Sequence, residues 1–265
     1  MLNRFFSEGI PLGLAQAALA TLLALAVMFL ARWREIRLER ETIVSLGRGI
    51  VQVVIVGSVL LLLFEAPLWT AMIVLPAMVV AAAAIARRRA ASIPRVFWVS
   101  LAGIAFGSGI VIVLMTFLGV IAADLTDLIP VGSMLIANAM NTSGLALDRF
   151  RSEVVSHVGQ IEAGLALGAP SEKMVRPYTQ AAVTASLIPR LDSLRSLGIV
   201  WIPGLMAGMI LSGTDPVYAA IYQFVVLAMI FAAAGLSSVA TTVLVRRYIF
   251  SDAEQLLLRP AVETG

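Results

Sequence analysis

Long apolar runs constrain this chain more than any other feature of its sequence. A helix of about 20 apolar residues crosses the roughly 30 Å hydrocarbon core of a bilayer. Seven candidate spans lie at residues 10–31, 43–64, 67–86, 96–121, 129–147, 198–213 and 217–245. Hydrophobic residues make up 60% of the 265 positions and charged residues only 13%, which excludes an ordinary soluble domain. We therefore expect an all-α integral membrane protein with about seven transmembrane helices in a single domain over residues 1–265.

The basic residues predict which way the chain crosses the membrane. All of the 19 Lys and Arg residues except Arg4 fall in the segments 32–48, 87–95, 148–197 and 246–265. Cytoplasmic loops of membrane proteins carry an excess of Lys and Arg. We therefore expect the N-terminus outside and the C-terminus inside, in a multi-pass protein of the inner or plasma membrane. The segment 148–197 is then its one sizeable cytoplasmic region, and whether 178–197 re-enters the membrane stays open.

The residue types that are scarce exclude several kinds of chemistry. The chain has no Cys and a single His, His157, so one copy has neither a thiolate metal site nor a pair of histidine ligands. Its single lysine, Lys173, is followed by Met174, whereas a phosphate-binding loop needs Ser or Thr there. We therefore expect no catalytic residues and no cofactor. We also expect no nucleic-acid partner, because excess Arg in a membrane protein is first a topology signal. The ligands of a transported metal stay unknown at this stage.

One cytoplasmic run resembles the coupling helix of ABC transporters, which docks into a separate ATPase subunit. The signature of that helix in importers reads E-A-A-x-x-x-G. Glu162, Ala163, Gly164 and Gly168 fall at those spacings, with Gly in place of the second Ala. A short helix of small residues permits close docking against another protein, and Glu162 can pair there with a basic residue. The resemblance implies that this run couples the chain to an ATPase.

The wider sequence is similar to the FetB-type permeases of two-component ABC exporters linked to iron, and to the related plant aluminium-tolerance permeases. The resemblance covers about residues 43–250, and the block 187–223 is its most specific part. That block contains Leu187, Ile188, Pro189, Asp192, Ser193, Gly198, Pro203, Gly204, Met206, Gly208, Gly213, Asp215, Pro216, Tyr222 and Gln223. The resemblance implies a permease that exports a metal ion or metal complex and works with two copies of a dedicated ATPase. It also implies a second copy of the chain itself, both set in the lipid bilayer.

Four polar side chains inside the expected spans are candidates for a translocation path. Asn138 and Asn141 are three residues apart and so share a helix face, and Gln52 and Gln223 lie on the second and seventh spans. The alternative is hydrogen bonding between helices, which membrane helices use routinely. Nearby, Asp192 could pair with either Arg190 or Arg195. Both interpretations of the amides stay open on the sequence alone.

Two glycine pairs are candidates for close helix packing. Gly103 and Gly107 form one G-x-x-x-G, and Gly204 and Gly208 form another. Small residues four apart let helix backbones approach closely. Either pair could serve packing within one chain or the contact between two copies.

We expect a permease subunit of an ABC exporter for iron or a related metal, with no chemistry of its own. The main alternative is a self-sufficient secondary transporter of a small ion or solute, which usually carries an ionisable residue deep in a span. An intramembrane enzyme has few candidate nucleophiles and bases in this chain. A structural or assembly factor is the remaining class.

Overall fold

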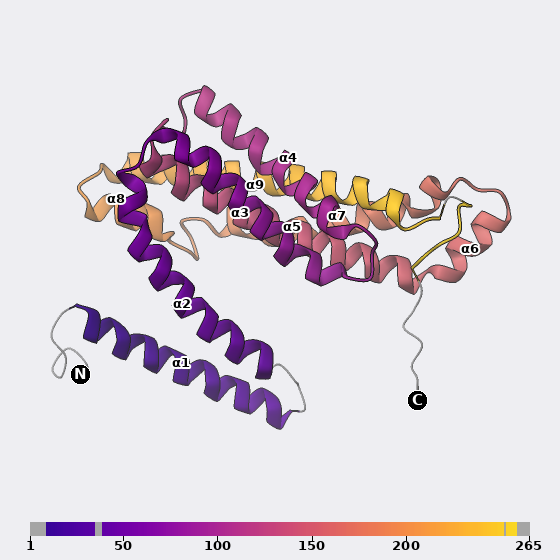
Figure 1. The fold of residues 1–265 in the computed structure, drawn as a ribbon, viewed down its shortest axis with the longest axis horizontal. Helices are drawn as coiled ribbons and strands as arrows, with labels where there is room; N and C mark the ends of the chain where they lie inside the picture. Colours follow the sequence, from indigo (N-terminus) through magenta and orange to yellow (C-terminus); the bar gives the residue numbers. More distant parts are fainter. Residues whose placement is uncertain (1–8, 35–38, 252, 259–265) are drawn as a thin grey trace. The chain divides into compact units, whose positions relative to one another are not determined.

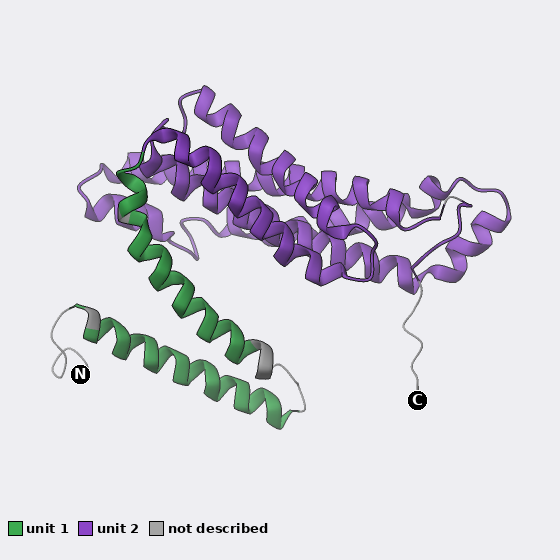
Figure 2. Ribbon diagram, viewed as in Figure 1, with its two compact units in different colours: residues 1–66 green, residues 67–265 purple. Residues whose placement is uncertain are grey.

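The computed structural model describes residues 9–34, 39–251 and 253–258, and these are almost wholly helical (Figure 1). Within them, strand pairing is limited to two isolated β-bridges. The chain divides into two compact units, residues 1–66 and 67–265, coloured separately in Figure 2. The expected all-α architecture is therefore confirmed.

The first unit is a pair of helices, α1 (Ile10–Trp33) and α2 (Glu39–Phe64), which contact each other. Most of their large apolar side chains are exposed, including Leu23, Phe29 and Val53. Such surfaces are typical of helices that lie in lipid rather than water.

The second unit is a bundle in which five long helices of the described chain run side by side and alternate in direction (Figure 1). Its elements are η2 (Leu68–Thr70), α3 (Ala71–Ala86), η3 (Arg87–Ala90), α4 (Val96–Phe117), α5 (Leu125–Ser156), α6 (Val158–Ala166), α7 (Ser171–Ser196), α8 (Gly204–Leu211), α9 (Pro216–Val245) and η4 (Arg246–Tyr248). The long helices are α3, α4, α5, α7 and α9. The short helix α6 lies at one end of the bundle and α8 lies at the other.

Five helices among the described residues are long and apolar enough to cross a membrane. They cover Pro11–Trp33, Thr42–Phe64, Leu68–Ala90, Val96–Phe117 and Pro216–Tyr248. These match five of the seven spans expected from the sequence. The expected span at 129–147 lies within α5, which is more polar than these five helices because it carries Asn138 and Asn141 within the span and charged residues towards both ends of the helix.

The expected span at 198–213 is wrong. The only helix there is α8, whose eight residues rise about 12 Å. Gly198 has a φ of +74°, and a backbone bridge between Leu197 and Trp201 turns the chain before Pro203 precedes the helix. Gly213, at a φ of +94°, turns the chain again directly after α8. Two turns that need glycine therefore interrupt what looks like one apolar run.

The long helix in this part of the chain is α7, which the sequence analysis places in the cytoplasmic region. Its 26 residues rise about 39 Å and pack along α5 and α9. The helix continues through Pro177 and Pro189, although proline removes a backbone hydrogen bond at each point. Both prolines are exposed, and the face of α7 that packs against the bundle consists of Val175, Thr179, Ala182 and Ser186.

Two apolar clusters form the interior of the bundle. The α8-end cluster joins α3, α4, α5 and α9 through residues such as Ile112, Leu135 and Val226. The α6-end cluster joins the ends of α4, α5, α7 and α9 with α6 and the C-terminal segment, through residues such as Phe150 and Ile161. Each end of the bundle is therefore held by its own core.

Carboxylates begin two of the long helices at the α8 end. Asp215 accepts hydrogen bonds from the backbone N–H groups of Val217 and Tyr218, at 2.9 and 3.0 Å, and so caps α9. Asp124 caps α5 by accepting from the Asp127 N–H at 2.9 Å, and it also accepts from the Thr126 hydroxyl. These bonds, that of the hydroxyl above all, lower the pKa of Asp124 below its ordinary value.

Candidate functional site

A cavity of about 240 Å³ lies in the second unit where α5, α7, α8 and α9 meet, and we call it the α5–α9 cavity. Much of its wall is apolar. Its polar wall comes from three helices, because α5 supplies Asn138, α7 supplies Arg190 and Ser193, and α9 supplies Gln223. Trp201 and the first residues of α8 complete the lining.

Two of these polar groups lack partners within the described chain. Gln223 is only 4% exposed, and its Oε1 atom accepts no hydrogen bond. The Nε atom of Arg190 is likewise buried without a partner. Asn138 instead donates from Nδ2 to the carbonyl oxygen of Met134 at 2.7 Å. A buried polar group left unpaired costs about 1–3 kcal/mol, so this arrangement favours a bound ligand or water in the cavity.

The structure brings together two of the four amides expected to line a path. Asn138 and Gln223 both line the α5–α9 cavity. Asn141 is exposed on the surface of α5, and Gln52 is exposed on α2 in the first unit. The described residues contain no cluster of three or more His, Asp or Glu side chains that could hold a metal ion.

Arg190 is the cavity residue that sequence reasoning missed. The sequence left open whether Asp192 pairs with Arg190 or Arg195, and the structure pairs it with Arg195 at 3.5 Å. Helical spacing offered a signal, because Asp192 and Arg195 are three residues apart and share a face. Arg190 and Ser193 share a different face, which is the one that lines the cavity.

The coupling-like residues lie at the opposite end of the bundle, on α6 and the turn that follows it. Glu162 and Ala163 are exposed, whereas Ile161 is fully buried in the α6-end cluster. Gly164 packs against α7, where an added Cβ would approach the Met174 sulfur to 2.6 Å. The helix therefore presents one face to solvent and fixes the other to the bundle.

Gly168 ends α6 in a left-handed conformation, with a φ of +83°. Its N–H donates to the Leu165 carbonyl at 2.9 Å, and the Ala169 N–H donates to the Gly164 carbonyl at 3.0 Å. This pair of bonds is the Schellman arrangement that favours glycine after a helix. Leu167, beside it, is 89% exposed. The turn therefore holds an apolar side chain exposed at the α6 end of the bundle.

The C-terminal segment packs in the same apolar cluster as α6, a contact that the sequence did not predict. Leu256 and Leu258 are buried in the α6-end cluster, and the Leu257 N–H donates to the Ile249 carbonyl at 2.8 Å. Glu162 and the stretch 253–256 line a shallow hollow between the two segments. An ion pair of 3.3 Å between Arg246 and Glu172 joins the end of α9 to the start of α7.

The two glycine pairs differ in their surroundings. A Cβ on Gly103 would overlap Thr241, and one on Gly107 would overlap Ser237, so both glycines lie against α9. Gly204 and Gly208 on α8 have open space at the same position. The first pair therefore packs α4 within the chain, and the second pair leaves a smooth surface on α8.

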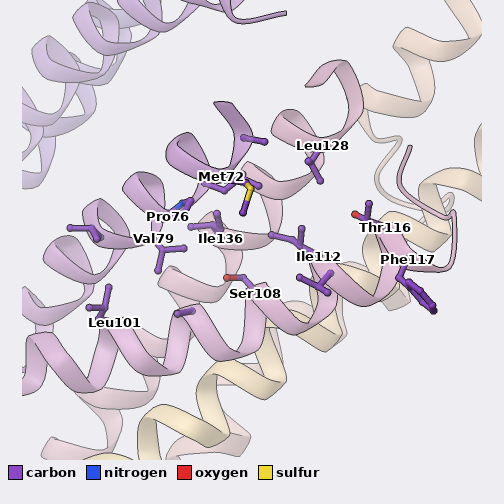
Figure 3. A pocket seen from close by; sticks show the side chains of 16 residues that line it. Met72, Pro76, Val79, Leu101, Ser108, Ile112, Thr116, Phe117, Leu128 and Ile136 are labelled. Atoms are coloured by element: carbon purple, nitrogen blue, oxygen red, sulfur yellow. The ribbon is translucent and has the colours of Figure 1, made fainter. Parts of the chain in front are cut away.

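A larger groove of about 820 Å³ lies between α3 and α4 over α5 (Figure 3). Met72, Pro76, Val79 and Leu101 point into it, and Ser108 and Thr116 supply its hydroxyl groups. The Ser108 hydroxyl already donates to the Ile104 carbonyl at 2.6 Å. A surface of this kind suits hydrocarbon, so the polar α5–α9 cavity is the better candidate for a transported ligand.

Comparison with known proteins places the chain in a family. Residues 14–250 match the model of an uncharacterised protein family, UPF0014. The chain is 32% identical to the probable iron export permease protein FetB of Escherichia coli K12, over 91% of this chain and 93% of that protein. It is also 32% identical to ALUMINUM SENSITIVE 3 of Arabidopsis thaliana, over 92% and 90%, and 31% identical to the membrane protein YjkA of Bacillus subtilis, over 90% and 96%. No solved structure matches the chain.

These matches span nearly the whole of each protein; FetB is named as a probable permease and YjkA as a membrane protein. The similarity to iron-export and aluminium-tolerance permeases expected from the sequence is confirmed. This chain is therefore a multi-pass membrane protein that belongs to the UPF0014 family.

Proposed function

We propose that this chain is the membrane-spanning subunit of an ABC exporter for iron or a related metal. The observation that carries the proposal is its similarity to the probable iron export permease FetB along more than nine-tenths of both chains. Because Lys173 is followed by Met174, the sequence lacks the lysine and hydroxyl of a phosphate-binding loop. ATP hydrolysis then belongs to a separate subunit.

The ATPase docks on the solvent face of α6 in this proposal. Glu162, Ala163 and Leu167 are exposed there, and Ile161 anchors the helix in the α6-end cluster. Because that cluster also contains residues of α4, α5, α7 and α9, a push on α6 is transmitted to four long helices at once. Two copies of the permease and two of the ATPase form the transporter, and the open surface at Gly204 and Gly208 is available for contact between permeases.

The crossings are α1, α2, α3, α4, α5, α7 and α9, with α7 taking the place of the run 198–213. The number of crossings stays at seven, so the two termini lie on opposite sides of the membrane. The basic residues place the N-terminus outside and the C-terminus inside. The α6 end of the bundle is then cytoplasmic, and its basic residues are Arg87, Arg88, Arg89, Arg95, Arg149, Arg151, Lys173, Arg176, Arg246 and Arg247. The coupling region consists of the end of α5, α6 and the first turns of α7, and the rest of α7 belongs to the bundle.

Single cysteines test this topology, because the native chain has none. In intact cells, an impermeant maleimide is expected to label Ala123→Cys and Ile199→Cys, and to label Ala166→Cys only after the membrane is opened. All three positions are exposed, and Ile199 is 85% exposed. Ile199 is the discriminating position, because it lies outside only if α7 crosses the membrane. Labelling of Ala166→Cys in intact cells would contradict the orientation.

Reconstitution with the ATPase tests the function itself. Co-expressed permease and ATPase are expected to copurify, and iron, supplied as the free ion or as a soluble complex, is expected to stimulate ATP hydrolysis by the complex several-fold in liposomes. The permease alone is expected to hydrolyse no ATP. Metal transport by the permease alone, driven by an ion gradient, would favour the secondary transporter. Arg190 offers no route for proton coupling, because a guanidinium group stays protonated in proteins.

A further inference from the structure

We propose that the α5–α9 cavity binds a small soluble oxyanion that also carries a hydroxyl group. If the proposed export function holds, the exported species then presents anionic oxygen atoms to the protein rather than a bare metal cation. The substrate-class part of the inference rests on that function, and the binding part does not.

The charge of the cavity comes from Arg190. Among the described residues no carboxylate forms an ion pair with it, and the nearby Asp192 is taken by Arg195. A guanidinium group is permanently charged, so it repels a metal cation and attracts an anion, and water exclusion strengthens both effects. Its unpartnered Nε–H is ready to donate a charge-assisted hydrogen bond to an anionic oxygen.

The start of α8 adds to the attraction for an anion. Gly204 and Leu205, its first residues, line the cavity, and Pro203 before them supplies no side-chain cap. The first N–H groups of a helix lack partners within the helix and carry its positive end, so they bind anionic groups readily. The N-terminus of α8 and Arg190 therefore act on the same cavity with the same sign.

The remaining polar groups of the cavity can hydrogen-bond a hydroxyl group on the ligand. Gln223 presents an unpartnered acceptor, and Ser193 contributes only an acceptor because its hydroxyl donates to the Pro189 carbonyl at 2.9 Å. Asn138 has a second amide N–H beyond the one that bonds Met134. The cavity of about 240 Å³ is many times larger than the roughly 10–15 Å³ that one water needs on the same measure, which is room for a small carboxylic acid.

Trp201 lines the cavity and provides a local signal for the test. The chain has four Trp residues, so replacing Trp33, Trp69 and Trp98 with Phe leaves Trp201 as the reporter. The purified permease in phosphatidylcholine nanodiscs is titrated at constant ionic strength with malate, with succinate, and with inorganic phosphate. We expect a saturable change in fluorescence with malate and phosphate. Succinate, which is malate without its hydroxyl, is expected to bind at least fivefold more weakly.

Two substitutions assign the signal to the cavity. Arg190→Gln is expected to weaken malate binding at least tenfold, because it removes the only charge in the cavity wall among the described residues. Arg195→Gln is the matched control, five residues along the same helix but exposed and paired with Asp192, and we expect its affinity to stay within twofold. Gln223→Leu leaves the charge of Arg190 in place and is expected to remove the preference for malate over succinate.

Several results would overturn the proposal. They are the absence of a saturable response to any of the three anions, an equal response in Arg190→Gln, and a response to Mg²⁺ or Fe²⁺ alone. A response only after phosphatidylglycerol is added would assign the cavity to a lipid headgroup and also overturn it. None of these titrations needs the ATPase. Failure of anion binding therefore leaves the ABC proposal standing, and failure of the ATPase to copurify leaves the anion site standing.

Discussion

Replacing Gly168 with Asp is expected to abolish transport while the permease reaches the membrane at its normal level. The residue lies in the exposed turn after α6, beside Leu167, and nothing lies within 4 Å of the position of an added Cβ. The substitution therefore disturbs no core contact of the chain itself. It does place a charge on the proposed docking surface, where removal from water on binding the ATPase is unfavourable. Recovery of the ATPase in pull-downs and metal export from liposomes measure the effect.

Gly168→Asn is the matched control for the backbone. Its side chain has nearly the same shape as Asp, and both residues tolerate the left-handed conformation at a φ of +83° better than other side chains. If charge on the docking surface is the cause, Asn retains most of the ATPase association and Asp loses it. Equal loss in both variants would instead point to the turn after α6. Full association and transport with Asp would mean that α6 is not the coupling element.

The local pattern around α6 was readable from the sequence because it depends on neighbouring residues. Glu162, Ala163, Gly164 and Gly168 resemble the signature of a short docking helix, and the structure has the short helix α6 there, which ends at the glycine turn. What the sequence did not predict is the support beneath that helix. Leu256 and Leu258 come from a segment almost a hundred residues away, and no periodicity links them to Ile161.

The error at 198–213 has a physical cause. Hydropathy measures how apolar a run is, but it does not register that Gly198 and Gly213 turn the backbone. The same measure undervalues α7, whose polar side chains face other helices and solvent along the bundle. Hydropathy predicted the five apolar helices and also the run 129–147 within α5, but it missed α7.

The candidate cavity was half predictable for a related reason. Asn138 and Gln223 are amides within apolar runs, so the sequence pattern alone identifies them as candidates. Arg190 does not stand out among 19 basic residues, and its importance depends on α7 lying beside α5 and α9. Only the packing of α5, α7 and α9 together distinguishes an arginine that lines the cavity from one that lies in a loop.

Replacing Gly107 with Val is expected to destabilise the permease by at least about 3 kcal/mol, at or above the upper end of ordinary overpacking. Gly107 lies on α4 where that helix packs against α9. An added Cβ would come within 2.7 Å of the Ala233 carbonyl oxygen and closer still to Ser237. Much of what it meets is backbone, which cannot rotate away as a flexible side chain can. A loss of this size lowers the melting temperature by roughly 6–12 °C for a chain of this length, measured in detergent.

Gly109→Val separates this clash from the cost of placing Val in a helix. Gly109 lies on the same helix two residues away, and nothing lies within 4 Å of its Cβ position. The change in helix propensity is then the same in both variants, so the difference between them reports the contact with α9. We expect Gly109→Val to melt within a few degrees of the wild type. If both variants melt alike, α4 and α9 are not in close contact at Gly107. If only Gly107→Val is unstable, this glycine pair serves packing within one chain, and contact between copies falls to other surfaces such as α8.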